Sequence, residues 1–202
     1  MAHCILILGD SHTRDMNTAF KKILPSCLTF IITVPAGLNA IIYKYRSMLH
    51  HVVTFNPSIV IIHAGHNDIV FHHHHNPHPR NPRTVTDEIL QLVDELCTNH
   101  PTIQPFISSI FPRTFTARSY LPEPEIIPYN KKIKRHGQHL LSITEDTAIT
   151  TLLNMCLWHR ISSAIENSEP FDEDGLHLTK EGKLAVVQEW LSIIYPDDTP
   201  ST

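Results

Sequence analysis

Cys4-Ile5-Leu6-Ile7-Leu8-Gly9-Asp10-Ser11 is a short apolar run that ends in a glycine and two polar residues. Such a run, apolar on both faces and bounded by glycine, is typical of a strand buried inside a parallel sheet. Pro105 lies within a later run and favours an edge or bulged strand there. The other apolar runs of this kind span residues 28–34, 58–63, 103–110 and 148–153.

Segments with helical periodicity alternate with these strands. Apolar residues between Val85 and Leu96, for example, recur every three or four positions. This alternation predicts an α/β fold with three layers, α/β/α, and a five-stranded parallel sheet in the flavodoxin-like order 2-1-3-4-5. Two long loops are expected, at 71–83 and 111–128. The predicted helices span residues 13–24, 39–50, 84–97, 129–141 and 179–195.

The composition fits one globular domain over residues 1–202. The 16 Lys and Arg against 20 Asp and Glu give a net charge of -4, which does not indicate binding to nucleic acid by bulk charge. Four scattered cysteines and the lack of a long apolar run favour an intracellular, cytoplasmic domain without a membrane span. The abrupt first strand and polar tail are compatible with a domain cut from a longer protein.

Polar residues follow the strand ends, which meet at one edge of a parallel sheet. Ser11 comes directly after the first strand, and a serine hydroxyl needs a base to act as a nucleophile. His177 is the candidate base, and Asp174, three residues earlier, can hold one of its ring nitrogens. Asp172 and Glu173 are rivals for that orienting role, although the spacing favours Asp174.

Acyl transfer also needs donors for an oxyanion. The candidates are the backbone N–H groups of Ser11 and Gly37 and the side-chain amide of Asn67. Each residue also has a structural interpretation: Ser11 as a helix cap, Gly37 as a turn glycine, and Asn67 with Asp68 as an Asx turn. Asp10 is interpreted as a loop anchor.

Four ordered blocks resemble those of the SGNH (GDSL-type) serine hydrolases: Gly9-Asp10-Ser11, Gly37, Gly65-x-Asn67-Asp68 and Asp174-x-x-His177. The resemblance extends from residue 4 to about residue 190. It implies a serine esterase without cofactor or metal, with a catalytic triad of Ser11, His177 and Asp174 and an oxyanion hole from Ser11, Gly37 and Asn67. His12 departs from the family pattern, which has leucine there.

Two narrower resemblances concern parts of the chain. Ile110-Phe111-Pro112-Arg113 resembles a turn in platelet-activating-factor acetylhydrolase-like members, and Arg113 is a candidate substrate-binding residue. Gly9-Asp10-Ser11-x-x-Arg14 and residues 60–69 are similar to the esterase domain in the first-open-reading-frame protein of some LINE-type retrotransposons. That resemblance implies self-association through segments outside this chain. The broader resemblance to the SGNH hydrolases implies a substrate ester with a short acyl group such as acetyl.

Two rival functions remain open. The first is a lipid-active acetylhydrolase or lysophospholipase that docks on membranes through Leu121, Ile126 and Ile127. The second is a non-catalytic assembly or binding module. The His72–His75 run lacks the partners of a defined metal site and is expected to be a solvated loop. The basic residues from Lys131 to Arg135 are expected to be a solvated helix face, with contact to phosphate or lipid headgroups as the alternative.

Overall fold

Five strands form one parallel sheet in the order β2-β1-β3-β4-β5. The computed structural model describes residues 4–24, 28–33, 41–69, 80–114, 123–145, 147, 149–152, 154, 157 and 170–196. The strands are β1 (Cys4–Gly9), β2 (Leu28–Thr33), β3 (Ile59–His63), β4 (Gln104–Ser108) and β5 (Thr150–Leu152). The α/β architecture expected from the alternating pattern is therefore present.

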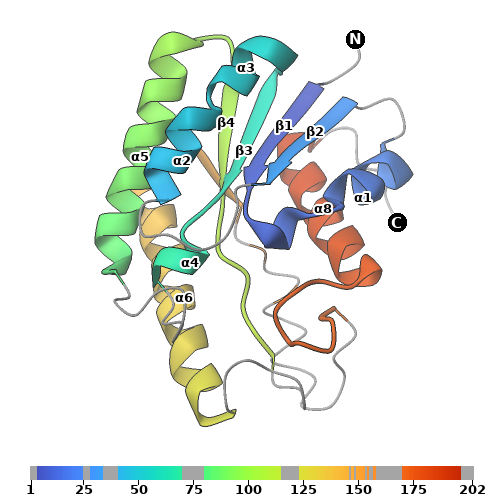
Figure 1. Ribbon diagram of the computed structural model, residues 1–202, viewed down its shortest axis with the longest axis vertical. Coiled ribbons are helices and arrows are strands. Elements are labelled where there is room, and N and C mark those ends of the chain that lie inside the picture. Colours follow the sequence, from blue (N-terminus) through green and yellow to red (C-terminus); the bar gives the residue numbers. More distant parts are fainter. Residues whose placement is uncertain are drawn as a thin grey trace.

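Helices cover both faces of the sheet (Figure 1). On one side lie α1 (Met16–Ile23) and α8 (Lys180–Ile194), which contact each other. On the other side lie α2 (Ile41–Met48), α5 (Pro82–Asn99) and α6 (Glu123–Thr144). Two short helices, α3 (His50–Phe55) and α4 (His66–Ile69), flank β3 in the chain. None of the helices described is both long and apolar enough to cross a bilayer.

The strands divide their side chains between two cores, because successive residues of a strand point to opposite faces. Leu6 and Leu8 of β1 pack with α5 and α6 in one core. Ile5 and Ile7 pack with α1 and α8 in the other, where Trp190 is fully buried. β1 is thus apolar throughout because both of its faces are covered by helices.

Local chemistry moves several helix boundaries away from the predicted ones. The helix expected from residue 13 begins at Met16, because residues Ser11–Thr13 form a 3-10 turn, η1, and Asp15 adopts a left-handed conformation with φ 63°. The helix expected over 39–50 is shorter, and a separate helix, α3, follows it. The long loop expected over 111–128 is interrupted because α6 already begins at Glu123 and contains Pro128.

Pro105 does not place β4 at the sheet edge, contrary to the sequence-based expectation. β4 lies between β3 and β5, and Pro105 pairs with Val60. The pairing with β5 starts only at Phe106, opposite Thr150. Since β5 does not reach Pro105, the missing N–H costs no ladder hydrogen bond on that side.

Candidate active site

Ser11 lies at the carboxyl end of β1, in the turn that Asp10 caps. The Asp10 carboxylate accepts a hydrogen bond from the His12 N–H at 3.0 Å, and the Asp10 carbonyl accepts one from the Thr13 hydroxyl at 2.9 Å. Gly9 permits this tight turn, because a Cβ there would lie 2.2 Å from the Thr13 hydroxyl oxygen. Ser11 is left half-buried at the surface of the turn. The interpretation of Asp10 as a loop anchor is therefore confirmed.

Asp174 and His177 lie in a closed turn between Pro170 and Thr179. Phe171 and Leu178 form an antiparallel bridge, and the Thr179 N–H donates to the Pro170 carbonyl at 3.2 Å. Gly175 adopts φ 68°, a conformation that side chains disfavour. The turn is tied to the segment after β4 by a hydrogen bond from the Thr114 N–H to the Gly175 carbonyl at 3.0 Å.

Three polar side chains from the two turns line up. Asp174 Oδ2 lies 2.5 Å from His177 Nδ1, and His177 Nε2 lies 3.3 Å from Ser11 Oγ. Because the carboxylate can only accept, Nδ1 carries a proton, and in the neutral ring Nε2 presents a lone pair to the serine hydroxyl. The side chains of His177 and Asp174 are 38% and 23% exposed, so the row opens to solvent.

Asp174 is fixed as an anion. Its Oδ1 accepts the backbone N–H groups of Leu176 and His177, each at 2.9 Å. Burial opposes ionisation, but the hydrogen bonds from His177 and Leu176 outweigh it and hold the pKa of the Asp174 carboxyl below its ordinary value. These hydrogen bonds place the Asp174 carboxylate against the imidazole, the position that the sequence spacing favoured.

The donor groups of the two other predicted oxyanion residues, Gly37 and Asn67, lie outside the described part of the structure. Gly37 lies outside the described residues. Asn67 belongs to α4, the single helical turn after β3, and its side chain is outside the description. Gly65 leads into α4 with φ 102°, which permits the sharp exit from β3. The roles of Gly37 and Asn67 stay predictions.

Arg113, the predicted substrate-binding residue, is buried and 3% exposed. Its guanidinium donates to His66 Nε2 at 2.7 Å and lies over the Tyr129 ring. Because arginine only donates, His66 must carry its proton on Nδ1, which lies 3.0 Å from the Tyr129 hydroxyl. Asn130 fixes the Arg113 backbone through bonds of 2.9 and 2.7 Å. Arg113 thus joins the segment after β4 to α4 and α6, and its contact with substrate stays a prediction.

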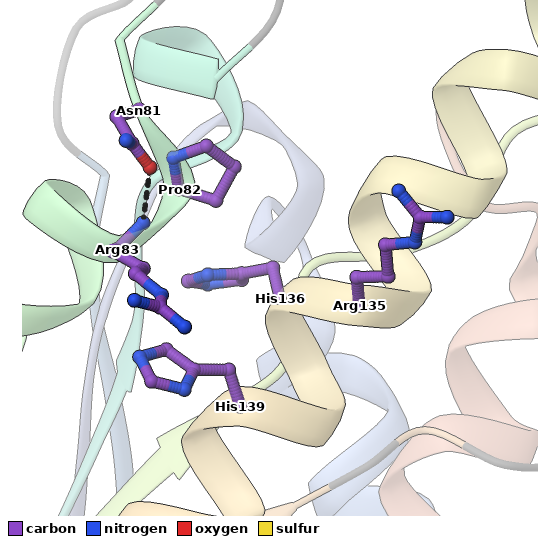
Figure 2. Close-up of a pocket in the computed structure, with 6 residues that line it drawn as sticks. All are labelled: Asn81, Pro82, Arg83, Arg135, His136 and His139. Atoms are coloured by element: carbon purple, nitrogen blue, oxygen red, sulfur yellow. Dashed lines mark hydrogen bonds between the residues drawn. The ribbon is translucent and has the colours of Figure 1, made fainter.

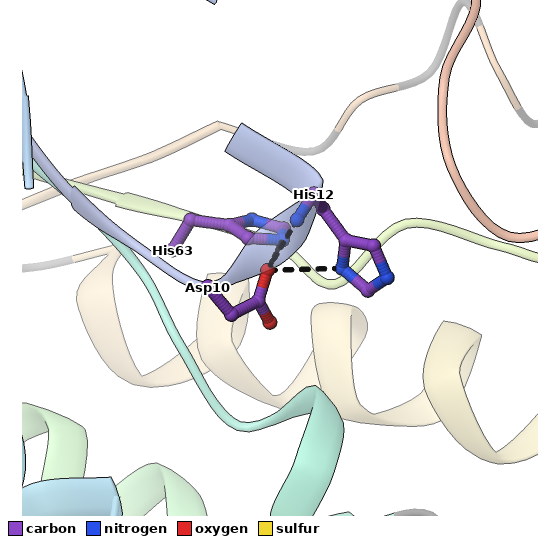
Figure 3. A group of neighbouring side chains, drawn as sticks. All are labelled: Asp10, His12 and His63. Atoms are coloured by element: carbon purple, nitrogen blue, oxygen red, sulfur yellow. Dashed lines mark hydrogen bonds and ion pairs between the residues drawn. The ribbon is translucent and has the colours of Figure 1, made fainter. Parts of the chain in front are cut away.

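A second row of imidazoles lies beneath the serine turn, and sequence reasoning did not find it (Figure 3). His12 is 1% exposed and His63 is fully buried, and both face Asp10. Burial lowers the pKa of His63 to about 4, an effect that Asp10 partly offsets. Burial would raise the pKa of Asp10, but the two imidazoles and the hydrogen bond from His12 hold it below its ordinary value.

The basic segment from Lys131 to Arg135 is only partly a solvated face. Lys132 is half-buried and donates to the Ile69 carbonyl at 2.8 Å. Arg135 is exposed and borders a pocket of about 510 Å³ between α5 and α6 (Figure 2). That pocket is lined by Asn81, Pro82, Arg83, Arg135, His136 and His139, none of which belongs to the Ser11 turn. The His72–His75 run lies outside the described residues.

Solved structures with GDSL-like names share this fold. A putative acylhydrolase from Bacteroides fragilis matches with a TM-score of 0.67 at 18% identity, over 95% of this chain and 87% of that chain. A GDSL-like lipase from Bacteroides thetaiotaomicron matches with a TM-score of 0.66 at 16% identity, over 95% and 88%. The chain therefore has the fold of the GDSL-like hydrolases.

A particular similarity is to a catalytic variant of an acetylxylan esterase from Geobacillus stearothermophilus. It matches with a TM-score of 0.66 at 14% identity, over 100% of this chain and 99% of that chain. No protein-family model matches the sequence, and no curated protein matches it. The narrower resemblance to a retrotransposon esterase domain gains no support from these comparisons.

Proposed function

We propose that the protein is a serine esterase that hydrolyses carboxylic esters with short acyl groups. The observation that carries this proposal is the row Ser11–His177–Asp174, with contacts of 3.3 and 2.5 Å between its members. Nucleophilic acyl transfer requires a hydroxyl, an unprotonated ring nitrogen and a carboxylate arranged in this order. The fold that the chain shares with GDSL-like hydrolases also supports ester hydrolysis.

The reaction follows from the orientation of each group. Ser11 Oγ attacks the ester carbonyl while His177 Nε2 takes its proton, and the resulting imidazolium is stabilised by Asp174. The tetrahedral intermediate collapses when His177 returns the proton to the leaving alcohol. Water, deprotonated by the same imidazole, then hydrolyses the acyl-serine. The Ser11 N–H, the Gly37 N–H and the Asn67 amide are the proposed donors to the oxyanion.

We prefer esters with short acyl groups to lipids as the proposed substrates. Of the three residues that suggested membrane docking, Ile126 is only 6% exposed and belongs to the interior. Ile127 is 62% exposed and Leu121 lies outside the described residues, so among the described residues one exposed isoleucine supports the lipid-active alternative. The name of the Geobacillus esterase, which refers to acetylated xylan, is consistent with the acetyl end of the range. The retrotransposon connection stays a prediction from the sequence resemblance.

Two measurements test the proposal. A fluorophosphonate probe should label Ser11, and the labelling should vanish in Ser11→Ala and fall sharply in His177→Ala. A series of p-nitrophenyl esters should show the highest kcat/KM for acetyl and butyryl chains and a decline for longer ones. A correctly folded wild-type protein that takes up no probe would instead favour the non-catalytic binding module. Preference for long-chain esters on vesicles would favour the lipid-active enzyme.

A further inference from the structure

Three buried polar atoms beneath the serine turn have no hydrogen-bond partner among the residues that the structure describes: Asp10 Oδ2, His12 Nδ1 and His63 Nε2. Unpaired buried polar atoms are rare in folded proteins, because each costs on the order of 1–3 kcal/mol. Here all three belong to one group of neighbouring side chains. One carboxylate oxygen and the two ring nitrogens lie within 4.8 Å of one another (Figure 3). Asp10 Oδ1 is 3.1 Å from His12 Nδ1 and 3.8 Å from His63 Nε2.

The hydrogen bonds around His63 determine which of its nitrogens carries the proton. The single proton of the Ser108 hydroxyl is donated to the Ser109 carbonyl, and Asn154 Nδ2 donates to the same hydroxyl oxygen. The contact of 3.0 Å between Ser108 Oγ and His63 Nδ1 must therefore be a bond donated by Nδ1. His63 Nε2 then points a lone pair at a carboxylate, and two buried acceptors face each other.

An arrangement of this kind needs a cation between its members. Neighbouring ligands of a metal ion point at the ion and not at each other, and His12 Nδ1 lies 3.1 Å from Asp10 Oδ1 without the geometry of a hydrogen bond. Ligand atoms about 2.0–2.2 Å from Zn²⁺ are roughly 3.3 Å apart in a tetrahedron, close to the observed 3.1 and 3.8 Å. Two imidazoles and one carboxylate are a common ligand set for zinc with one open position.

The surroundings also fit a metal centre. His63 is oriented by Ser108, as expected of a ligand whose second nitrogen is fixed by a neighbour. His66 packs against His12 with ring centroids 4.3 Å apart, yet both of its nitrogens are engaged, so it is not a fourth ligand. The His12 ring lies 5.7 Å from that of the half-exposed His177, so the cluster lies one side chain below the open side of the site.

We propose that Asp10, His12 and His63 bind one divalent transition-metal ion, with Zn²⁺ as the best match to the ligands. The ion would connect β1, η1 and β3, and it would fix the backbone on both sides of Ser11. This departs from the sequence-based expectation of no metal. It also goes beyond the proposed esterase activity, because the binding site contains neither Ser11 nor His177.

The test is stoichiometric binding in a background free of the histidine run. A variant with His72, His73, His74 and His75 all replaced by asparagine is stripped with a chelator and then titrated with Zn²⁺ against a chelating indicator. We expect one equivalent of Zn²⁺ and a higher Tm with the metal. In the same background, His12→Leu and His63→Gln should each weaken binding at least about 100-fold. His100→Gln, at the end of α5, is the matched control and should change nothing.

Co²⁺ keeps the proposal falsifiable if either substitution prevents folding. Bound to the background variant, it should give the intense visible absorption of a four-coordinate site. Three results would overturn the metal site and leave a proton in the cluster. They are the absence of one tightly bound equivalent of metal, binding that survives both His12→Leu and His63→Gln, and only the weak spectrum of six-coordinate Co²⁺. Ser11→Ala should bind Zn²⁺ normally, so a failure of the metal site and a failure of the esterase proposal are separable.

Discussion

Asp174 accepts hydrogen bonds on both carboxylate oxygens, and only one of them serves the imidazole. Oδ1 holds the turn through the N–H groups of Leu176 and His177, while Oδ2 fixes the ring. Asparagine could keep an oxygen toward the turn, but it would then present an amide N–H to His177 Nδ1. That nitrogen would have to accept, and the proton would move to Nε2, where Ser11 needs a base.

Asp174→Asn should therefore lower kcat/KM for p-nitrophenyl acetate by about 10³- to 10⁴-fold while the fold persists. Asp172→Asn is the matched control and should stay within a few-fold of the wild type. Steady-state kinetics, with circular dichroism to verify folding, makes the comparison. Equal losses in both variants would contradict the assignment of the orienting role to Asp174.

Motif spacing could predict which residues meet at the site but not what supports them. Ser11, Asp174 and His177 follow the ends of elements that a parallel sheet brings to one edge, so their meeting follows from topology. His12 and His63 show no such pattern, because the sequence around a histidine beside an apolar strand does not distinguish a buried side chain from a solvated one. Only packing reveals that both face Asp10.

At the scale of elements, α8 holds the turn of Asp174 and His177 in place. The helix begins after Thr179, whose hydroxyl accepts the Gly182 N–H at 3.1 Å. Gly182 lets the first turn of α8 approach the carbonyl of Pro170, since a Cβ there would lie 2.1 Å from that oxygen. Because the contact is with a backbone carbonyl, no flexible side chain could move aside to make room for a Cβ.

Gly182→Ala should push the start of α8 away from Pro170. We expect a loss of about 1–3 kcal/mol in the free energy of unfolding and a kcat reduced by up to about 100-fold, because the imidazole shifts relative to Ser11. Urea denaturation and steady-state kinetics measure the two effects. Glu181→Ala, at the exposed neighbouring position, should leave both nearly unchanged, and an equally mild effect of Gly182→Ala would refute the close approach.

The contact between α5 and α6 contains a buried histidine. The Thr86 hydroxyl donates to the Pro82 carbonyl, so His136 Nδ1 donates to Thr86 Oγ1 at 3.0 Å. Burial lowers the pKa of His136 to about 4, and His139 adds to the effect. The folded protein therefore takes up this proton later than the unfolded chain as the pH falls.

The contribution of His136 to stability should consequently be complete above its unfolded pKa of about 6.5 and should be lost as the pH falls toward 4. The full loss is on the order of 3 kcal/mol. Urea unfolding from pH 7 to pH 4.5 should show a steeper decline for the wild type than for His136→Gln, with His100→Gln, at the end of α5, as the control. Parallel curves for the wild type and His136→Gln would show that His136 titrates normally.

The helix boundaries that sequence periodicity missed have local causes. Hydrophobic spacing could predict five helices and their faces, but the Asp10 cap converts residues 11–13 into a 3-10 turn. The extension of α6 back to Glu123 was also missed, because its two prolines, Pro124 and Pro128, discourage a helix assignment. Pro124 falls in the first turn of α6, where its missing N–H is unpaired anyway.

At the scale of the whole molecule, one strand connects two hydrophobic cores. Leu6 and Ile7 are adjacent in β1 and fully buried, but they point into opposite cores. β1 is also hydrogen-bonded to both β2 and β3 at the centre of the sheet. Neither helical layer can therefore separate without exposing one face of the same strand, and we expect the domain to unfold as one unit.

Leu6→Ala and Ile7→Ala form a matched pair that tests this coupling. Each should lower the free energy of unfolding by about 2–5 kcal/mol, because each leaves a cavity in a closely packed core. Differential scanning calorimetry should give a single transition for the wild type and both variants, with equal calorimetric and van't Hoff enthalpies. If either variant instead melts in two steps, one helical layer can detach while the other persists. The turn of Ser11, which follows β1, and that of His177, which precedes α8, would then belong to separately stable units.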